Sequence, residues 1–522
     1  MGRTSRWTLA IVASAFSLLN LAAQDCPVRP DTGSVVLNPY NITSKDGALN
    51  ATLVLGHSVD TSGYTHYCYK YQAPKKIAES PTLWVNPGDV LNLKVIDDIK
   101  NTNDAMKMDM GPALGPACGD GGAATVNSTN VHFHGMNVPP TCHQDNVITT
   151  LIQPGSPGFQ FNVQIPKTQP PGLYWYHPHV HGFTEFQVNG GAAGAIIVNG
   201  MEKVRPEVAG LTQRVFVIRQ QYLVPWIPGP YQLSLNYQVT PLFGPKPIIN
   251  MKPGEKQFWR IANATLQDFL QLQIQVNGVL QPMELIALDG YPLPQTRNQT
   301  TILVPPAGRA EFIVQAPPAG SNAIFFSNGY DTGPTGNADL SQILGNIVTT
   351  TAAAAETPDR LPKATPPSED GVKFFDKAQQ PATIQRKLFF SEEFGGTNGP
   401  IQFYITVEGQ RQRVFEPNEV PVITTKVGAI EDWTIENRAL ETHAFHMHQI
   451  HFRVLEVDGE PAPNSDLRDT IEIPFWEGKG PYHSVKLRMD FSDPSTAGTF
   501  LFHCHILLHE DLGMMHKILV EP

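Results

Sequence analysis

Three segments of the chain repeat one pattern, in which a turn glycine precedes a strand with apolar residues at alternate positions. The glycines are Gly88, Gly254 and Gly428, at similar intervals along the sequence. Alternation with a period of two places apolar side chains on one face of a β-strand. Three such repeats predict three related β-domains. The fifth and seventh residues after each glycine are Leu93 and Val95, Trp259 and Ile261, and Trp433 and Ile435.

The composition also favours strands and turns. The 522 residues include 46 prolines and 43 glycines, and only 16% are charged. Short half-buried strands bury their apolar faces most economically when one sheet packs on another. We therefore predict an all-β fold of three consecutive β-sandwich domains. The predicted domains span residues 24–200, 201–350 and 384–522, with a linker rich in alanine, threonine and proline at residues 351–383.

The first residues have the three parts of a secretory signal. Arg3 and Arg6 precede an apolar run at residues 9–19, and a small-residue cleavage site ends at Ala23. This pattern predicts a signal peptide at residues 1–23 and a secreted or periplasmic protein. No later stretch approaches the ~20 apolar residues of a spanning helix, so we expect no transmembrane segment in the mature protein. The formal net charge of −11 disfavours nucleic acid as a partner, because phosphate backbones bind basic surfaces.

The cysteines indicate disulfide bonds. Four of the five cysteines lie in the first 142 residues, and an exported protein meets an oxidising compartment. Two disulfides are expected, but four cysteines allow three pairings that the sequence does not rank. These cysteines are Cys26, Cys68, Cys118 and Cys142.

The fifth cysteine lies in a histidine-rich segment near the end of the sequence. On an extended strand His503 and His505 share one face, and Cys504 points to the other. A thiolate, an imidazole and a weak thioether are the ligands of a blue-copper site, so Cys504, His509 and Met514 form a partial copper set. The alternatives are a zinc site and an ordinary buried cysteine. A further ligand must come from elsewhere.

The histidines are unevenly distributed. None lies between His181 and His443, so the middle unit offers no imidazole to a metal. Each His-x-His pair on an extended strand presents both rings to one side. The first and last units must therefore meet to build a shared site. The four pairs are His132 and His134, His177 and His179, His446 and His448, and His503 and His505.

These motifs together resemble those of the multicopper oxidases of the laccase type. They are His-x-His-Gly, His-x-His, His-x-x-His-x-His and His-Cys-His-x-x-x-His, and with the repeats the resemblance covers nearly all of the mature chain. It implies three cupredoxin-like, Greek-key domains and four copper ions. By this resemblance His443, Cys504, His509 and Met514 hold the type 1 copper, and His132 and His446 hold the type 2 copper. One type 3 copper takes His134, His177 and His505, and the other takes His179, His448 and His503.

The resemblance also implies a reaction. A phenolic or aromatic amine donor gives single electrons to the type 1 copper, and Cys504 passes them to the trinuclear cluster, where dioxygen is reduced to water. Asp145 and Glu510 resemble the carboxylates that relay protons to the cluster, although ordinary solvated acids are the alternative. An axial Met514 predicts a low to middle reduction potential, and Met515 is interpreted as core packing.

Two other functions are considered. A metallo-oxidase acting on Cu(I), Fe(II) or Mn(II) would need acidic or methionine-rich groups over the type 1 site, and only Met106, Met108 and Met110 hint at it. A non-catalytic copper-binding protein would not need the complete histidine set. The physiological donor, the oligomeric state and the source remain open. Of the other histidines, His181, His451 and His516 flank motifs and are expected beside the site or at the surface, and His57, His66, His143 and His483 are expected to be structural.

Overall fold

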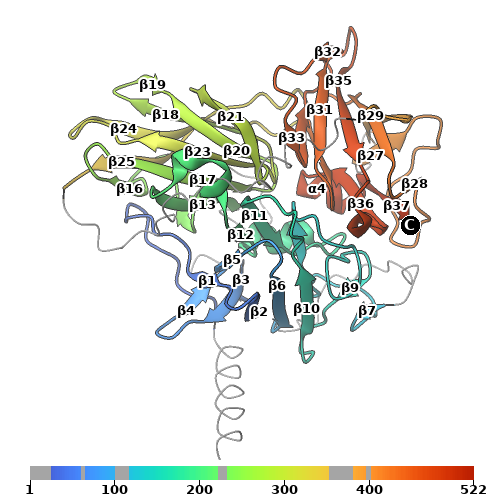
Figure 1. Cartoon of the computed structure of the whole chain (residues 1–522), viewed down its shortest axis with the longest axis horizontal. Coiled ribbons are helices and arrows are strands. Elements are labelled where there is room, and N and C mark those ends of the chain that lie inside the picture. The colour runs from blue at the N-terminus through green and yellow to red at the C-terminus, as the bar shows by residue number, and fades with distance from the viewer. Residues whose placement is uncertain (1–24, 60–64, 100–116, 222–231, 352–379, 395–400) are drawn as a thin grey trace, which may run out of the picture.

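The computed structural model describes residues 25–59, 65–99, 117–221, 232–351, 380–394 and 401–522. The predicted signal peptide, the three methionines at positions 106, 108 and 110, and most of the predicted linker lie outside these residues. The described residues form mainly strands and turns, which confirms the all-β prediction. Figure 1 shows three groups of strands, with the first unit in blue and teal, the middle unit in green and yellow, and the last unit in orange and red. The predicted domain boundaries remain predictions.

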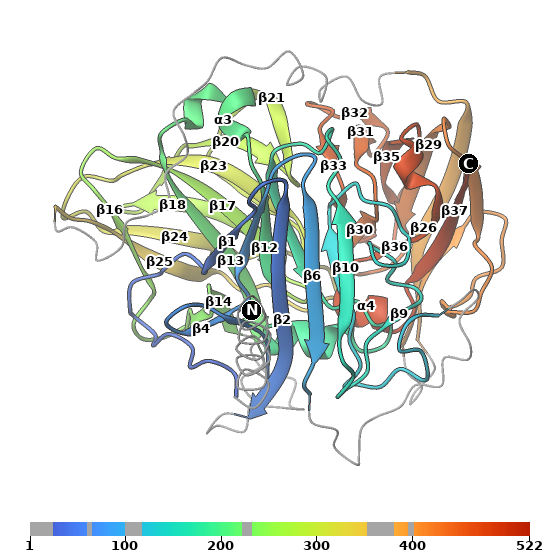
Figure 2. The ribbon, with the colours of Figure 1, turned by 60° about the horizontal axis from the view of Figure 1, so that its bottom comes forward.

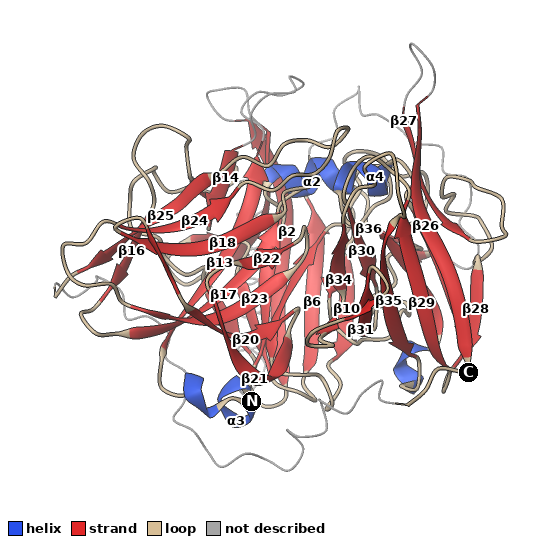
Figure 3. Ribbon diagram, turned by 90° about the horizontal axis from the view of Figure 1, so that it is seen from above, coloured by secondary structure: helices blue, strands red, loops and turns tan. Residues whose placement is uncertain are grey.

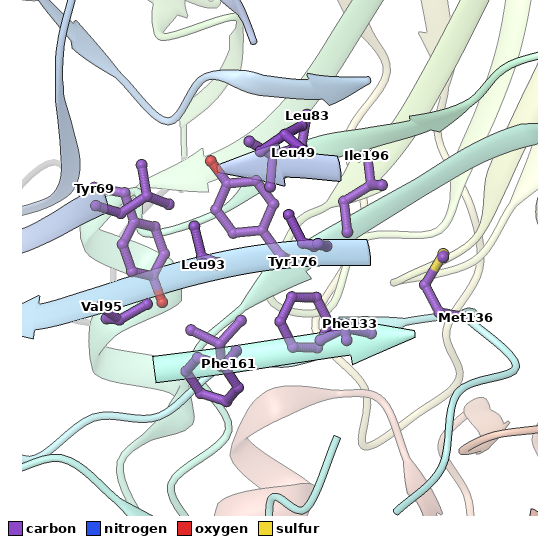
Figure 4. Close-up of a cluster of buried hydrophobic side chains, with 14 of the residues drawn as sticks. Leu49, Tyr69, Leu83, Leu93, Val95, Phe133, Met136, Phe161, Tyr176 and Ile196 are labelled. Atoms are coloured by element: carbon purple, nitrogen blue, oxygen red, sulfur yellow. The ribbon is translucent and has the colours of Figure 1, made fainter. Parts of the chain in front are cut away.

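The first unit packs two sheets around one apolar core. Figure 4 shows Leu93, Phe133 and Tyr176 gathered in this core, where all three are fully buried. A two-stranded sheet of β7 (Cys118–Gly119) and β9 (Thr150–Leu151) lies outside the sandwich. One main sheet has the order β1 (Asn41–Thr43), β5 (Thr82–Val85), β12 (Gly194–Val198), β11 (Gly172–His177), β8 (His132–His134), and the other has the order β10 (Phe159–Gln164), β6 (Val90–Asp97), β2 (Ala48–Val59), β3 (Thr65–Gln72), β4 (Ile77–Glu79).

The middle unit is built in the same way around a separate core. Figure 2 shows its strands beside those of the first unit. One sheet has the order β15 (Gln238–Val239), β14 (Gln232–Leu235), β13 (Thr212–Gln221), β17 (Lys256–Ala264), β23 (Arg309–Gln315), β20 (Met283–Leu288), β21 (Tyr291–Gln299). The other has the order β16 (Ile248–Met251), β25 (Gln342–Thr349), β24 (Ala323–Asn328), β18 (Leu270–Val276), β19 (Val279–Gln281), with β22 (Ile302–Val304) also paired to β18.

The last unit repeats the arrangement with a third core, which includes Cys504 and Met514. One sheet has the order β27 (Ile401–Val407), β26 (Ile384–Phe394), β29 (Ile430–Asn437), β35 (His483–Asp490), β31 (Phe452–Val457), β32 (Glu460–Pro461), with β33 (Leu467–Arg468) paired to β31. The other has the order β28 (Ile423–Lys426), β37 (Met515–Glu521), β36 (Gly498–Cys504), β30 (His443–Met447), β34 (Thr470–Ile473).

The sequence repeat corresponds to equivalent strands. β6, β17 and β29 each pair in parallel with the strand that opens their sheet in sequence (β2, β13 and β26), and in antiparallel fashion with β10, β23 and β35. The repeat is thus confirmed. The expected half-buried pattern holds for β6, but β17 is buried along nearly its whole length. The second face of β17 is covered because Ala262 and Ala264 pack with Trp175 of the first unit.

Few residues are helical. Figure 3 shows α2 (Thr184–Gly190) and α4 (Leu507–Asp511) side by side, where Asp511 accepts hydrogen bonds from the backbone N–H groups of Thr184 and Glu185. Among the described residues, no helix is long and apolar enough to cross a membrane. The other helical elements of the described ranges are α3 (Met201–Val204) and the 3₁₀ turns η1 (Pro206–Val208) and η4 (Pro494–Thr496).

Both expected disulfides are present. Cys26 bonds to Cys68, and Cys118 bonds to Cys142. The first ties the N-terminal segment to β3, and the second joins β7 to the loop that follows β8. Cys504 is buried and makes no disulfide.

We predict that Gly172→Ala destabilises the joint between the first two units. A Cβ at Gly172, the first residue of β11, would overlap the Gly290 carbonyl oxygen and lie 2.7 Å from the Gly290 Cα. Because these are backbone atoms, the strands must separate, at a cost of about 1–3 kcal/mol. Calorimetry should record a lower unfolding temperature. Gly345→Ala is the control, since its added Cβ would meet the movable Cδ1 of Ile249 at 3.1 Å and the Pro247 carbonyl oxygen at 3.2 Å, so that its neighbours need to move much less. An equal effect of both substitutions would contradict this prediction.

Candidate metal centre

Equivalent strands of the two outer units carry the histidines. In the first unit β8 pairs with β11, and His132 lies opposite His177. In the last unit β30 pairs with β36, and His446 lies opposite His503. The two sheets face each other, so that the His132 ring stacks on His448 with ring centroids 3.9 Å apart, and His134 stacks on His446 at 4.0 Å. The first and last units therefore meet through these side chains.

The predicted cluster histidines lie close enough to hold metal ions together. His503 Nε2 lies 3.4 Å from His179 Nε2 and 3.1 Å from His448 Nε2. His505 contributes a ring whose centroid is 5.0 Å from that of His134. Three groups of histidines have candidate ligand atoms all within 4.8 Å of one another, namely His179, His448 and His503; His132, His134 and His177; and His132, His446 and His448.

A second group surrounds Cys504. Its Sγ lies 3.6 Å from His443 Nδ1 and 3.8 Å from His509 Nδ1. Met514 is fully buried in the same apolar core, and the Cys504 backbone N–H donates to the Met514 carbonyl. The structure therefore brings all four predicted residues of the mononuclear site together.

Buried nitrogen atoms test whether these groups fit metal ions. A buried polar atom without a partner is costly, so a native protein pairs nearly all of them. Yet Nε2 of His132, His177 and His446 has no hydrogen-bond partner. Their Nδ1 atoms are occupied, by Asp145, by the Pro178 carbonyl and by the Asp469 carbonyl respectively. A histidine that uses one ring nitrogen as a donor presents the lone pair of the other to a metal, so the residues fit metal binding.

Burial also sets the protonation of the ligands. It lowers the pKa of seven of the cluster histidines, to about 3 for His503, and neighbouring imidazoles lower most of these values further. Burial raises the pKa of the Cys504 thiol. The imidazoles with a lowered pKa are therefore neutral and ready to bind, while the thiol loses its proton only when a cation binds. The pKa is lowered well below its usual range for His134, His177, His179, His446, His448, His505 and His509.

The two predicted carboxylates lie at the cluster. Asp145 is buried, and its two oxygens lie 3.1 and 3.0 Å from His132 Nδ1. Glu510 is fully buried with its oxygens 3.6 Å from His179 Nδ1 and 3.4 Å from His503 Nδ1. Burial, with the nearby Asp511, raises the pKa of Glu510 well above its usual value. Neither residue is a solvated surface acid.

Sequence reasoning missed two carboxylates at the mononuclear site. Glu392 Oε1 lies 3.4 Å from His443 Nε2, and Glu441 Oε2 lies 3.6 Å from His509 Nε2. Their side chains are only 3% and 10% exposed. Burial and the charge of Glu392 raise the pKa of Glu441 to about 9. Glu441 could have been predicted from the sequence, because it precedes His443 by two residues. No local sequence pattern indicates Glu392.

The remaining histidines have other partners. His451 is buried against Asp469, and His516 Nδ1 forms a hydrogen bond of 2.7 Å with Glu419 Oε1. His181 packs edge-on against Phe415. His143 and His483 form hydrogen bonds away from the site, the former to Gln160 and the latter to Asp458 and Glu477.

Comparison with family models gives three matches, all described as multicopper oxidase. They cover residues 124–203, 174–352 and 395–522, which together make up more than half of the chain. The chain is 25% identical over 492 residues to the multicopper oxidase mco of Staphylococcus haemolyticus, covering 88% of this chain and 90% of that protein. It is 24% identical over 428 residues to a laccase of Bacillus subtilis, covering 75% of this chain and 79% of the laccase.

Solved structures show the same fold. The multicopper oxidase of Campylobacter jejuni, described as a metallo-oxidase, matches with a TM-score of 0.68 and 23% identity, covering 96% of this chain and 100% of its own. The McoA multicopper oxidase of Aquifex aeolicus matches with a TM-score of 0.66 and 18% identity, covering 94% of this chain and 99% of its own.

We predict that the metal-free protein loses stability in mild acid. The unfolded chain takes up protons at its histidines below a pKa of about 6.5, whereas the buried imidazoles of the folded state stay neutral. The stabilisation is therefore complete above about pH 6.5 and falls as the pH decreases towards the lower folded-state values. Each such histidine contributes up to about 1.4 kcal/mol per pH unit. Thermal unfolding of chelator-treated protein at pH 7 and pH 5 measures this loss of stability. In the His448→Gln variant the difference between the two unfolding temperatures should be smaller. An unfolding temperature that does not change between pH 7 and pH 5 would refute the prediction.

Proposed function

The chain belongs to the multicopper oxidase family, whose members are copper oxidoreductases that use dioxygen, and on this premise we propose how its own residues divide the work. One-electron oxidation of a small donor at a type 1 copper is coupled to four-electron reduction of dioxygen to water at a trinuclear copper cluster. His443, Cys504, His509 and Met514 hold the first centre. The cluster of three further copper ions is held by His132, His134, His177, His179, His446, His448, His503 and His505.

One observation supports the coupling most strongly. Cys504 Sγ lies against His443 and His509, while its two neighbours in sequence, His503 and His505, lie among the cluster histidines. The end of strand β36 and the residue that follows it thus supply ligands to both proposed centres. Bound copper would supply the single-electron steps and the reduction of dioxygen. A protein that only stored copper would not need this shared strand end.

The chain supplies protons and keeps the centres apart from bulk water. Asp145 and Glu510 lie against His132, His179 and His503, where a buried carboxyl group can give a proton to reduced oxygen and regain one from solvent. All the histidine ligands are buried, so water is kept from competing for the two proposed copper centres.

A donor that approaches the type 1 copper contacts carboxylates before it contacts the histidine ligands. The His443 side chain is fully buried and His509 is 4% exposed, with Phe403 stacked on its ring at 4.0 Å. Glu392 and Glu441 cover the outer nitrogens of these rings. A phenol or aromatic amine releases a proton as it loses an electron, and the Glu392 carboxylate beside His443 can accept that proton, whereas Glu441, with its pKa of about 9, already holds one at neutral pH. Phenols and aromatic amines are therefore the first proposed donors.

The same pair favours a second candidate function. Carboxylate oxygens are ligands for hard divalent cations, so Glu392 and Glu441 suit Mn(II) or Fe(II) better than the soft Cu(I). One structural relative is described as a metallo-oxidase. The methionines that hinted at Cu(I) lie outside the described residues. Export of the protein, proposed from the signal-like residues 1–23, agrees with the two disulfides.

We predict that Asp145→Ala and Glu510→Ala keep the blue absorption band but slow oxygen reduction. Neither residue contacts Cys504, so the thiolate chromophore should persist, whereas loss of a general acid commonly costs a factor of about 10² to 10⁴. Stopped-flow reoxidation of the fully reduced protein measures the step directly. Asp458→Ala, an exposed acid of the last unit, is the control. Normal reoxidation in both variants would sink the assignment.

We predict that Glu441→Gln and Glu392→Gln change donor oxidation selectively. Oxygen consumption should be compared for a phenol panel and for Fe(II), Mn(II) and Cu(I), with ferrocenemethanol as a donor that releases no proton and binds no carboxylate. A phenol oxidase should lose kcat/KM for phenols, and a metallo-oxidase should lose at least about tenfold for a divalent cation. Glu456→Gln removes a partly exposed carboxylate of the same unit, paired with Lys486, and serves as the control. Equal losses for ferrocenemethanol would show damage to the copper site itself.

A further inference from the structure

The middle unit has no histidine among the predicted ligands, yet it reaches the trinuclear site with one side chain. Arg309 begins β23, and its guanidinium is completely buried. It forms a two-pronged ion pair with Asp469 of the last unit, in which Nη1 lies 2.8 Å from Oδ1 and Nη2 contacts Oδ2. Asp469 is also completely buried. Paired parallel bonds of this kind fix the orientation of a carboxylate.

Asp469 in turn lies against two cluster histidines. Its Oδ1 is 3.4 Å from His134 Nε2, and its backbone carbonyl accepts a hydrogen bond of 2.8 Å from His446 Nδ1. Thr470 supports the same pair, because its hydroxyl donates to Asp469 Oδ1 and lies 3.1 Å from His446 Nδ1. Asp469 Oδ1 also lies 3.7 Å from His446 Nδ1. The contacts to Nδ1 leave His446 Nε2 available to a metal, while neither ring nitrogen of His134 has a hydrogen-bond partner, so its approach to Asp469 is an electrostatic contact.

Asp469 is unsuited to be a ligand itself. Arg309 engages both of its oxygens, Thr470 donates to one, and His451 Nε2 lies 3.3 Å from the other. His451 Nε2 makes its hydrogen bond to the Asp289 carbonyl at 2.8 Å, but the three donors from Arg309 and Thr470 alone leave the carboxylate little remaining capacity to bind a cation. Its position beside His134 and His446 instead matches that of an acceptor that orients metal-binding imidazoles.

Arg309 is anchored from all three units. Nη2 donates to the Asp289 carbonyl at 2.8 Å, and Nη1 donates to the Ala307 carbonyl at 3.0 Å, both in the middle unit. Nε lies 3.4 Å from the Leu173 carbonyl of the first unit. The guanidinium therefore cannot move unless the junction of the units moves with it.

The ion pair between Arg309 and Asp469 fills the space that a side chain at position 135 would need, and this position is Gly135. It follows His134 directly and has a φ of 80°, in the region that favours glycine. A Cβ at this position would overlap Arg309 Nη2 and lie 2.7 Å from Asp469 Oδ2. The glycine of the His-x-His-Gly motif is thus required here by a side chain from the middle unit.

We propose that Arg309 is a positioning residue for the trinuclear site, which acts by holding the Asp469 carboxylate against His134 and His446. The inference rests on the proposed role of these histidines as copper ligands. It gives the middle unit a defined part in a site to which it contributes no ligand. The copper held by His446, proposed as type 2, and the copper held by His134, proposed as type 3, should both be bound less firmly when the ion pair is lost.

The test compares Arg309→Met with Arg260→Met in the copper-loaded protein. Arg260 pairs with Glu311 on β17 and β23 of the same unit at 3.3 Å, and both side chains are buried, but no contact joins them to a cluster histidine. Both substitutions should lower the unfolding temperature. Only Arg309→Met should lose type 2 copper, seen as a reduced type 2 electron paramagnetic resonance signal and about 10- to 100-fold easier removal by a chelator. The blue band of the type 1 copper should persist in both variants.

A double variant separates positioning from simple charge balance. Arg309→Met with Asp469→Asn leaves no unpaired charge, so it should recover thermal stability relative to Arg309→Met. If Asp469 orients the histidines, type 2 copper should remain weakly held in the double variant. Retention of type 2 copper in Arg309→Met at the level of Arg260→Met, or its full recovery in the double variant, would overturn the proposal. Absence of type 2 copper from the unmodified protein would instead refute the proposed function, so the two failures are distinguishable.

Discussion

The stacking of histidines across the two outer units is the interaction on which the rest of the structure depends. His132 on His448 and His134 on His446 bring together strands from opposite ends of the sequence. Nε2 of His132, Nε2 of His446 and both ring nitrogens of His134 have no hydrogen-bond partner. Without a bound cation this arrangement costs free energy, because neutral imidazoles are desolvated for no hydrogen bond in return. The packing of the three β-sandwich units therefore has to offset the free-energy cost of this histidine cluster.

Local patterns predicted much of this molecule. Alternating apolar residues after Gly88, Gly254 and Gly428 identified three equivalent strands, because burial of one face leaves a periodic signal. Spacing within the histidine motifs indicated which rings share a face. The full burial of β17 was not predicted, since its second face is covered by another unit and the repeat alone does not reveal that partner.

The unpredicted part of the site consists of single residues brought in by tertiary structure. Arg309, Asp469 and Glu392 each lie in an unremarkable strand or loop, and each meets the site through a segment distant in sequence. No spacing rule links Arg309 to His134, which it approaches only through Asp469. Ligands come in motifs because one strand must present several of them, whereas the groups that orient ligands need only one contact each.

The position of the His503-Cys504-His505 strand, next to the last strand β37, has a consequence for biosynthesis. Both centres take residues from this segment, and β36 is held by pairing with β37. A growing chain has thus completed the sheets of its first two units before either centre has its full complement of donors. A chain that lacks this segment therefore offers neither centre its full set of ligands.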